Sequence, residues 1–415
     1  MKSLVYNVHP IGWATCWWLR RLWSGCLTTW VAGLRCREVD PPQLPGEDWV
    51  RVRTLIAGIC GTDTAILALK PPIDSILQAF SSPPMALGHE NVAIVEDVGA
   101  AVDTSWVGRR VCVDPTLACT ARGINPPCDR CRNGEYGACE RFGADGEGTS
   151  QLPPATCIGY NSRTGGTFGE QFVAHVSQLV AVPDGMSDED ASLTDPLACG
   201  LHASLRTDLS KARSVLVYGM GVLGLSIIMA LRARGFTGRI DALGRSDYLA
   251  DLVSSMGADE YVQLPAGARE RFEEIARRTG GSVQRARFDN YMLSGGYDVV
   301  FECAGSVQSL TETLKWTRSR GQVILVGTGS GRGVDLTPIW FRELSVIGAY
   351  GRQLERVDLR TIGSYPLTHE LMLSGKFKTA GLLTHTFRLS EYHKAFAVAM
   401  HKAPNRAIKV AFDFR

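Results

Sequence analysis

The sequence predicts an α/β protein of two domains, in which a mostly β domain is followed by a doubly wound parallel sheet. The chain has 415 residues, whereas single hydrophobic cores stop growing near ~250–300 residues. From Lys211 onward, β-type runs alternate with helical stretches, as in a parallel sheet covered by helices. Before about Pro183, short strand-like runs lie among loops rich in Gly, Pro and Cys, which is typical of a mostly β domain.

The elements expected in the C-terminal part follow one another in a regular order. A strand is expected at residues 214–218, followed by a glycine-rich turn and a helix over 223–232. Further strands are expected at 297–301 and 322–326, and a helix at 269–278. This alternation predicts βαβ units.

The N-terminal part predicts shorter strands, and two stretches that look like insertions. Strands are expected at residues 49–56, 92–98, 110–113 and 171–174. Residues 9–35 contain five tryptophans and three arginines, which favours an extra helix or hairpin, with a lid over the substrate or an oligomer contact as alternatives. Residues 282–294 interrupt a simple helix-to-strand connection. Neither insertion is assigned a chemical role.

Composition and charge argue for a cytoplasmic protein without a membrane span. Lys+Arg number 44 and Asp+Glu 42, a balance that favours neither nucleic acid nor an anionic membrane as partner. The longest uncharged run near the N-terminus, residues 22–34, is shorter than the ~20 residues that a spanning helix needs. The twelve cysteines are clustered in a long chain, so reduced thiols and metal ligands are expected rather than disulfides.

Four of these cysteines predict a structural zinc site. Cys119, Cys128, Cys131 and Cys139 form the pattern C-x8-C-x2-C-x7-C. The closely spaced pair lets two thiolates meet one tetrahedral ion, while turns bring the other two. Four thiolates leave no coordination position open, so such a site is structural. The alternative is a cluster of reduced buried thiols.

A second group of residues predicts a catalytic zinc site. Cys60 and His89 supply two ligands, and either Glu90 or Asp195 supplies the third, while the other carboxylate is an outer or exchanging ligand. Three protein ligands leave a position open for water or substrate. Asp63 is expected to accept the far N–H of His89. Alone, a cysteine or histidine is more often a core residue, but together they make the stronger case.

A glycine-rich turn predicts a dinucleotide site. Gly219, Gly221 and Gly224 form G-x-G-x-x-G, with Val222 and Leu223 between the last two glycines. The motif follows a β-run and opens an apolar helix, which provides a tight turn and a helix N-terminus for the pyrophosphate.

The end of the next strand predicts a preference for NADP(H) over NAD(H). NAD-preferring sites place an acidic residue about twenty positions past the glycine turn. Here that position is Gly244, followed by Arg245 and Ser246, which offer donors to a 2′-phosphate. The alternative is that Arg245 is a solvated loop residue and that Asp241 or Asp247 contacts the ribose.

These motifs together resemble the zinc-containing medium-chain dehydrogenases, among the alcohol, polyol, threonine and glucose dehydrogenases. The resemblance runs from about Val50 to the C-terminus in family order. The matching segments are 58–63, 88–90, the four lobe cysteines, 165–170, 195–202, the glycine turn, 341–350 and 407–410.

The resemblance implies a fold and an assembly. A GroES-like β domain is expected to form from residues 1–182 and 350–415, with a Rossmann domain at residues 183–349. Such enzymes are usually homodimers or homotetramers, so the expected partners are further copies of the chain and a small-molecule substrate.

The resemblance also implies an activity. The catalytic zinc lowers the pKa of an alcohol, Thr62 helps to remove its proton, and the nicotinamide takes hydride from the carbinol carbon. Three differences from the common pattern stand out: Ala65 where many relatives have a relay histidine, Ala93 for a usual glycine, and the longer spacing after Cys119. The tryptophan-rich stretch has no match in the family, so the resemblance does not identify the substrate.

Two other functions remain as alternatives. One is a zinc-free, quinone-reductase-like member of the same superfamily, against which Cys60, His89 and the lobe cysteines argue. The other is a structural or regulatory protein that binds the cofactor without catalysis. Such a protein has no need to keep both zinc sites together with Thr62.

Overall fold

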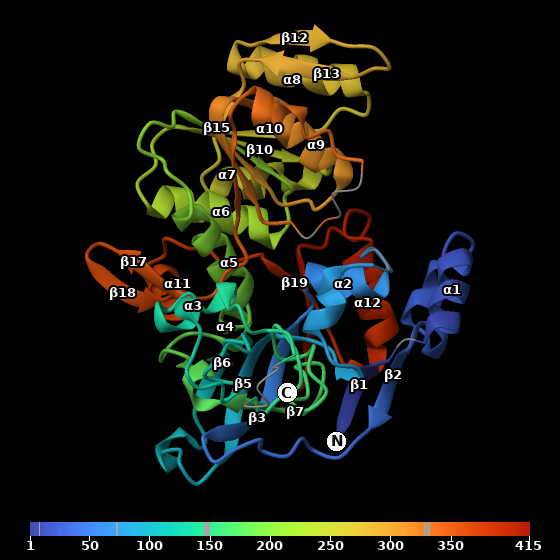
Figure 1. The fold of residues 1–415 in the computed structure, drawn as a ribbon, viewed down its shortest axis with the longest axis vertical. Coiled ribbons are helices and arrows are strands. Elements are labelled where there is room, and N and C mark those ends of the chain that lie inside the picture. The colour runs from blue at the N-terminus through green and yellow to red at the C-terminus, as the bar shows by residue number, and fades with distance from the viewer. Residues whose placement is uncertain (8, 72–73, 145–149, 328, 330–332) are drawn as a thin grey trace. The chain divides into compact units, whose positions relative to one another are not determined.

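The computed structural model describes residues 1–7, 9–71, 74–144, 150–327, 329 and 333–415. The chain divides into two compact units (Figure 1). Unit 1 contains Met1–Asp195, Arg352–Glu370 and Thr379–Arg415, and unit 2 contains Pro196–Gly351 and Leu371–Lys378. The domain boundaries expected at 182/183 and 349/350 stay a prediction. Among the described residues, every helix is too short or too polar to cross a membrane.

Unit 1 is built on a seven-stranded sheet. Its order is β19-β20-β3-β5-β6-β8, with β7 also paired to β3. The C-terminal β20 is antiparallel to β3, so the last residues complete a sheet begun near residue 49. Trp49, Val52 and Phe172 belong to the core on this sheet. The strands are β3 (Trp49–Gly58), β5 (Glu90–Val98), β6 (Arg110–Val113), β7 (Gln171–His175), β8 (Leu179–Ala181), β19 (Leu383–Phe387) and β20 (Lys409–Asp413).

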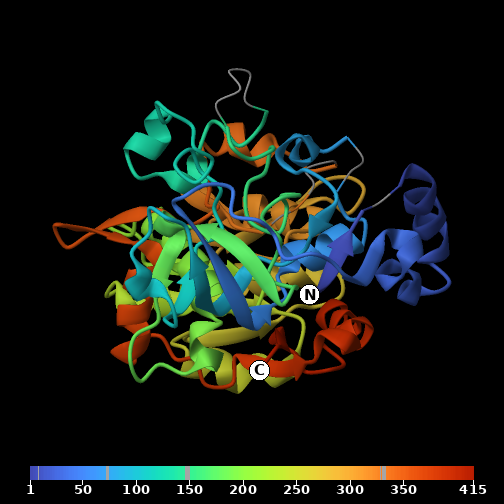
Figure 2. The ribbon, with the colours of Figure 1, turned by 90° about the horizontal axis from the view of Figure 1, so that it is seen from below.

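The tryptophan-rich insertion of unit 1 is a small helical module between two paired strands. β1 (Lys2–Tyr6) pairs with both β2 (Leu34–Glu38) and β4 (Met85–Ala86). Between β1 and β2 lie α1 (Pro10–Leu19) and the 3-10 turns η1 (Ser24–Thr28) and η2 (Trp30–Ala32). We call residues 9–37 the aromatic module, which is the dark-blue segment around α1 in Figures 1 and 2.

The remaining elements of unit 1 lie in its loops and around its sheet. A β-hairpin pairs β17 (Leu354–Val357) with β18 (Arg360–Gly363). α5 (Thr194–Leu205) begins in unit 1 and α11 (Ser364–Leu373) lies mostly within it. The others are α2 (Gly61–Leu67), η3 (Ile76–Phe80), η4 (Thr104–Trp106), α3 (Asp129–Arg132), η5 (Tyr136–Ala138), η6 (Val176–Gln178), α4 (Asp188–Ala191), η8 (Leu389–Glu391) and α12 (Tyr392–Met400).

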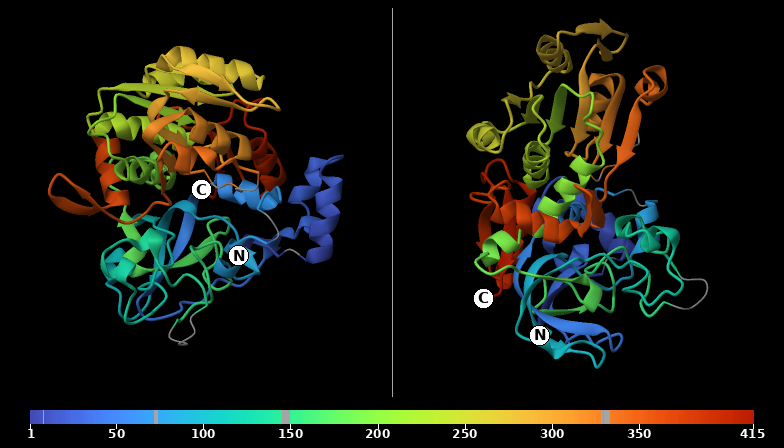
Figure 3. Two further views of the ribbon diagram at one scale, coloured as in Figure 1. Left: turned by 45° about the horizontal axis from the view of Figure 1, so that its top comes forward. Right: turned by 90° about the vertical axis from the view of Figure 1, so that its left-hand side faces the viewer.

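Unit 2 is a parallel six-stranded sheet in the order β11-β10-β9-β14-β15-β16. The chain order reverses between β9 and β14, which makes the switch point at which doubly wound sheets bind ligands. Figure 3 shows helices on both faces of this sheet. The strands are β9 (Ser214–Tyr218), β10 (Arg239–Gly244), β11 (Glu260–Gln263), β14 (Tyr297–Glu302), β15 (Thr317–Leu325) and β16 (Ser345–Gly348). The helices are α6 (Val222–Ala233), η7 (Asp247–Leu249), α7 (Ala250–Ser255), α8 (Ala268–Thr279), α9 (Val307–Trp316) and α10 (Thr337–Phe341).

The second insertion forms an antiparallel hairpin of unit 2. It pairs β12 (Ser282–Arg285) with β13 (Tyr291–Ser294). Tyr291 and Leu293 are buried, and the Tyr291 ring lies 5.7 Å from that of Phe272 on α8. The hairpin therefore covers one side of α8. With the two sheets, the predicted fold class, a mostly β domain and a doubly wound parallel sheet, is confirmed.

Candidate active site

Cys60 and the pair His89–Glu90 meet because of how two strands of unit 1 pair. β3 ends at Gly58, and β5 begins at Glu90. The strands are antiparallel, with Gly58 opposite Glu90. The end of β3 therefore lies beside the start of β5, and Cys60 follows at the N-cap of α2. A Cβ on Gly58 would clash with the Glu90 carboxylate, so a larger residue there would force that side chain to move.

These three residues form a donor set suited to zinc. One ligand atom each from Cys60, His89 and Glu90 lies within 4.8 Å of the others. His89 and Glu90 are buried, and Cys60 is half-buried. A thiolate, an imidazole and a carboxylate are ligands that zinc takes in proteins, and three of them leave a position open. The residues present therefore fit a catalytic zinc.

Asp63 lies behind His89 and fixes the start of α2. Its Oδ2 accepts a hydrogen bond from the Cys60 amide at 3.0 Å, and its Oδ1 accepts one from the Tyr160 hydroxyl at 3.2 Å. Oδ1 is 3.7 Å from His89 Nδ1, which is longer than a hydrogen bond. Burial disfavours the charged form of His89, but Asp63 and Cys60 outweigh it and raise the pKa of His89 to about 9.

Thr62 lies beside the donor set. Its Oγ1 is 3.5 Å from Cys60 Sγ, and the side chain is half-buried in the first turn of α2. The structure thus brings the predicted proton-transfer residue next to the predicted zinc ligands.

Glu90 has a partner that sequence reasoning missed. Lys409 of β20 forms an ion pair with Glu90 Oε2, and both side chains are 2% exposed. The Lys409 Nζ also donates to the Ile59 carbonyl at 3.1 Å. Lys409 interrupts an otherwise apolar run at residues 407–412. A charged residue in a buried strand indicates a buried partner of opposite charge. That signal was present in the sequence.

Asp195 is held away from the other donors. The Arg352 guanidinium donates to its two oxygens, from Nε at 2.5 Å and from Nη2 at 2.8 Å. The Tyr365 hydroxyl donates to Oδ1 at 2.5 Å. Among the described residues, the ligand atoms that lie within 4.8 Å of one another belong to Cys60, His89 and Glu90, and Asp195 is not part of this group. Burial opposes the charge of Asp195, but Arg352 outweighs it and lowers the pKa of Asp195 to about 2.

Sequence reasoning also missed Arg352 and Tyr365. They lie 157 and 170 positions from Asp195, so no local pattern joins them to it. The segment that carried the family resemblance ended at Tyr350, two residues before Arg352.

The four predicted lobe cysteines do come together. One sulfur from each of Cys119, Cys128, Cys131 and Cys139 lies within 4.8 Å of the others, and all four side chains are buried. The Sγ of Cys119 is 3.7 Å from that of Cys139 and accepts from the Cys128 amide at 3.4 Å. Backbone donors of this kind favour thiolates. Four thiolates at these distances fit one tetrahedral zinc with no open position.

The lobe is linked to Arg352 through the main chain. The Gly137 amide, between two lobe cysteines, donates to the Arg352 carbonyl at 3.2 Å. The Leu354 amide donates to the Gly134 carbonyl at 2.9 Å. The segment that holds Asp195 is thereby hydrogen-bonded to the cysteine lobe.

The glycine turn lies between β9 and α6 of unit 2. Gly219 has φ +113°, a conformation that favours glycine, and Gly224 packs on the Gly219 carbonyl. Gly221 is the N-cap of α6, and Val222 and Leu223 form its first turn. Apart from Gly221 itself and its neighbours in the chain, no described atom lies within 4 Å of where a Cβ on Gly221 would stand. The helix N-terminus thus opens onto space that suits a pyrophosphate.

The end of β10 presents Arg245 and Ser246. Arg245 is exposed, and the Ser246 carbonyl accepts from the Tyr261 hydroxyl at 2.6 Å. Asp241 is buried within β10 and accepts hydrogen bonds from Arg239 at 2.8 Å and from Tyr297 at 2.5 Å. These contacts hold Asp241 inside unit 2. Asp247, which is exposed, is therefore the acidic residue that remains as the alternative contact for the ribose.

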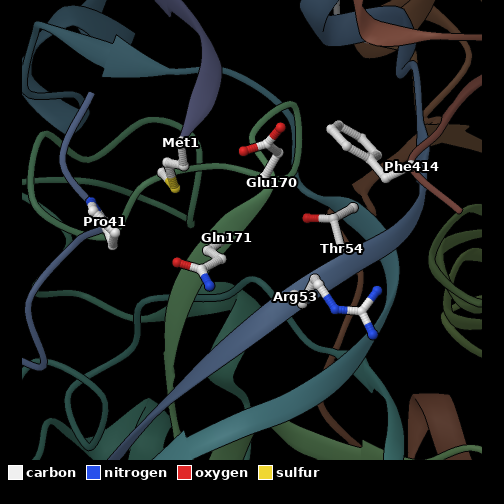
Figure 4. A pocket seen from close by; sticks show the side chains of 7 residues that line it. All are labelled: Met1, Pro41, Arg53, Thr54, Glu170, Gln171 and Phe414. Carbon is white, nitrogen blue, oxygen red and sulfur yellow. The ribbon is translucent and has the colours of Figure 1, made fainter. Parts of the chain in front are cut away.

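One hollow lies elsewhere in unit 1. It measures about 470 Å³ and lies beside the N-terminal residues (Figure 4). No predicted site residue is among those that line it, so it does not bear on the zinc chemistry. Its lining residues are Met1, Pro41, Arg53, Thr54, Glu170, Gln171 and Phe414.

Comparison with known families agrees with this site. Residues 46–184 match the alcohol dehydrogenase GroES-like domain. Residues 222–362 match the zinc-binding dehydrogenase family.

Full-length relatives point the same way. The chain is 30% identical over 392 residues to sorbitol dehydrogenase of Arabidopsis thaliana, covering 93% of this chain and 95% of the relative. It is 29% identical over 390 residues to L-idonate 5-dehydrogenase of Vitis vinifera, with 93% and 94% covered. The structure of zinc dependent alcohol dehydrogenase 2 from Streptococcus pneumonia superposes with a TM-score of 0.72 at 23% identity, covering 100% of this chain and 98% of that one. The chain therefore belongs to the zinc-containing medium-chain dehydrogenases, and is a zinc- and nicotinamide-dependent oxidoreductase of alcohols and polyols.

Proposed function

We propose that this chain interconverts a secondary hydroxyl group and a ketone on a polyol or sugar-derived substrate, and that Cys60, His89 and Glu90 hold its catalytic zinc. The observation that carries the proposal is the grouping of these three ligand atoms within 4.8 Å, beside Thr62. Relatives named for sorbitol and L-idonate support the substrate class.

Each residue of the site has a proposed role. When bound, zinc supplies a Lewis acid that acidifies an alcohol, and the nicotinamide supplies a hydride acceptor. Thr62 Oγ1 would receive the substrate proton while its own hydroxyl proton passes on toward solvent, so that the side chain relays the proton and stays neutral. Asp63 keeps His89 oriented from behind, by electrostatic attraction across 3.7 Å.

Glu90 and Asp195 are proposed to exchange as third ligand during turnover. Each carboxylate has its own cation, Lys409 for Glu90 and Arg352 for Asp195. In the arrangement described, Glu90 is the nearer carboxylate. Glu90→Gln and Asp195→Asn should each lower the rate or the zinc content; near-normal values in both variants would remove both residues from the ligand set.

The four cysteines of the lobe are proposed to hold a second, structural zinc. Their burial and mutual distances support this proposal. Elemental analysis of the purified protein should then give two zinc ions per chain, and active protein without zinc would refute the zinc chemistry altogether.

We also propose that the cofactor is NADP(H), because Arg245 and Ser246 follow Gly244 at the end of β10. Losing a charge-assisted contact costs about 1.5–3 kcal/mol, so Arg245→Ala should weaken NADP(H) binding by roughly ten- to a hundredfold. NAD(H) binding should barely change. Titration of both cofactors by nicotinamide fluorescence measures this. Asp247→Asn is the control. If that variant loses NAD(H) binding and the wild-type kcat/KM favours NAD(H), the alternative that Asp247 contacts the ribose is supported.

The substrate is tested with a panel of polyols, sugars, amino-alcohols and secondary alcohols, each with both cofactors. We expect turnover on polyols or sugar-derived substrates. Failure of the whole panel with zinc-loaded protein would favour a protein that binds the cofactor without catalysis.

The assembly and location complete the proposal. We place the enzyme in the cytoplasm as a homodimer or homotetramer, as is usual for the family. Light scattering coupled to size exclusion measures the assembly.

A further inference from the structure

The aromatic module has an inner face that packs on unit 1. Cys16 of α1 is buried together with Cys26 and Leu27, and Trp13 and Trp17 pack against this cluster. Leu69, just after α2, belongs to the same cluster. The module is therefore folded onto the body of unit 1 as a small core of its own.

The outer face of α1 is apolar as well. Its exposed residues are Pro10, Ile11, Ala14, Thr15, Trp18 and Leu19, of which only Thr15 is polar, and exposed Arg21 and Leu22 follow the helix. A helix that is apolar on all sides is normally buried all round, whereas this one leaves a face open. The exposed large apolar residues of the module, with the exposed fraction of each, are Ile11 (83%), Trp18 (71%), Leu19 (38%), Leu22 (89%), Trp23 (59%) and Trp30 (66%).

The charge of this segment is of one sign. The first 37 residues contain Lys2, Arg20, Arg21, Arg35 and Arg37 and no aspartate or glutamate, although the whole chain has a formal net charge of only +2. The first acidic residue is Glu38. Of these cations, Arg20, Arg21 and Arg35 lie beside tryptophans of the module, whereas Lys2 and Arg37 lie on β1 and β2.

The arginines lie on the tryptophans. The Arg20 guanidinium is 3.6 Å from the centre of the Trp17 ring. Arg35 lies 5.7 Å from the Trp30 ring, and Arg21 lies 6.0 Å from the Trp18 ring. An arginine beside an exposed aromatic ring places an apolar body and a cation at the same depth, which is the arrangement favoured at a lipid headgroup layer.

We propose that the aromatic module docks this protein on the surface of an anionic lipid bilayer. The apolar face of α1 enters the headgroup region, and the surrounding arginines pair with lipid phosphates. A second copy of the chain is the less favourable occupant, because a two-fold contact through this face would bring the cations of both modules together.

The module is fixed firmly enough to carry unit 1 with it. The Arg20 Nη1 donates to the Ala68 carbonyl at 2.8 Å, at the end of α2. The Thr28 hydroxyl is hydrogen-bonded to His393 Nδ1 of α12 at 3.0 Å. Docking therefore brings unit 1 to the membrane as a body, and it does not depend on the proposed substrate or cofactor.

The test uses the full-length protein and sedimentation with phosphatidylcholine vesicles, with or without about 30 mol% phosphatidylserine. We expect binding to the anionic vesicles that weakens as salt is raised. Trp18→Ser/Leu22→Ser should lower the partition coefficient by more than about tenfold. Arg21→Gln should lower it by about fivefold, since one arginine near an anionic surface contributes about this factor.

Two matched controls lie outside the module. Trp340 is 71% exposed, as Trp18 is, and Arg287 is exposed, as Arg21 is. Trp340→Ser and Arg287→Gln should bind vesicles like the wild type. Turnover and the melting curve show that each variant is folded, and Arg21→Gln still tests the idea if Trp18→Ser/Leu22→Ser fails to fold. The proposal is overturned if wild-type protein ignores anionic vesicles, if module and control variants bind equally, or if the module variants abolish self-association instead.

Discussion

The four-cysteine lobe takes all of its donors from residues 119–139, whereas the group around Cys60 is assembled from residues far apart in the chain. In the lobe, the sulfurs contact one another and nearby backbone amides. Around Cys60, the two carboxylates of the site are held by cations from distant segments, Lys409 for Glu90 and Arg352 for Asp195.

In the proposed function, the lobe stabilises the fold and the group around Cys60 takes part in the reaction. A lobe whose donors are all thiolates of one short segment is closed to substrate and adds folding free energy when it binds metal. In the proposed exchange, Glu90 or Asp195 would leave its cation, Lys409 or Arg352, to become the third zinc ligand. Substituting one member of each group tests whether the two groups differ in this way.

The largest expected effect is on turnover. His89→Ala or Cys60→Ser removes one of the three proposed zinc ligands, so turnover should fall by at least about a thousandfold. The melting temperature and dinucleotide binding should remain near those of the wild type. Steady-state kinetics with elemental analysis measures this, and one zinc per chain should remain. Loss of both zinc ions would show that the two sites depend on each other.

The next effect is on stability. Cys131→Ser removes a proposed ligand of the structural zinc, and the lost metal-binding free energy should lower the free energy of unfolding by on the order of 5 kcal/mol. Urea unfolding measures it. Cys303→Ser, outside both metal groups, serves as the control. A Cys131→Ser protein as stable as that control would mean that the lobe binds no structural metal.

A smaller loss is expected when Asp195 loses its cation. Arg352→Met keeps the apolar stem but leaves a buried carboxylate without its bidentate partner, which costs about 3–5 kcal/mol. The double variant Arg352→Met/Asp195→Asn should recover part of this loss, and a double-mutant cycle gives the coupling free energy. If the two single losses simply add, the pair is not coupled.

The smallest effect concerns pH. Burial lowers the pKa of His369 from 6.5 to about 4, and its Nε2 is hydrogen-bonded to the Thr194 hydroxyl at 2.9 Å. Between these values the unfolded chain binds a proton that the folded chain does not. The free energy of unfolding should therefore fall by up to roughly 3 kcal/mol as pH decreases from 6.5 to 4. His369→Gln should flatten this slope relative to the wild type; identical slopes would assign the pH dependence to other groups.

The sequence predicted the fold where local patterns determine it. The strand expected at residues 214–218 has these bounds in the structure. The helix expected at 223–232 is longer by one residue at each end, at Val222–Ala233. Here a buried apolar run, a glycine turn and an apolar helix follow one another without interruption. The strand expected at 322–326 begins earlier in the structure, at Thr317–Leu325, because residues 318–320 are polar and exposed and carry no strand pattern.

The site was predictable only in part, for a related reason. Cys60, His89 and Glu90 lie in recognisable short motifs, and antiparallel pairing of β3 with β5 brings them together. Arg352 and Lys409 act through contacts across 157 positions or more, so their role depends on topology that single-sequence patterns do not contain.

The pairing of β20 with β3 has a consequence for how the enzyme is made. Lys409, the partner of Glu90, is the seventh residue from the end of the 415-residue chain. The sheet of unit 1 therefore stays incomplete until the ribosome has synthesised β20. Unit 2, largely contiguous from Pro196 to Gly351, is able to fold first. During synthesis the nascent chain is thus able to form the parallel sheet of unit 2 before Lys409 is available to meet Glu90.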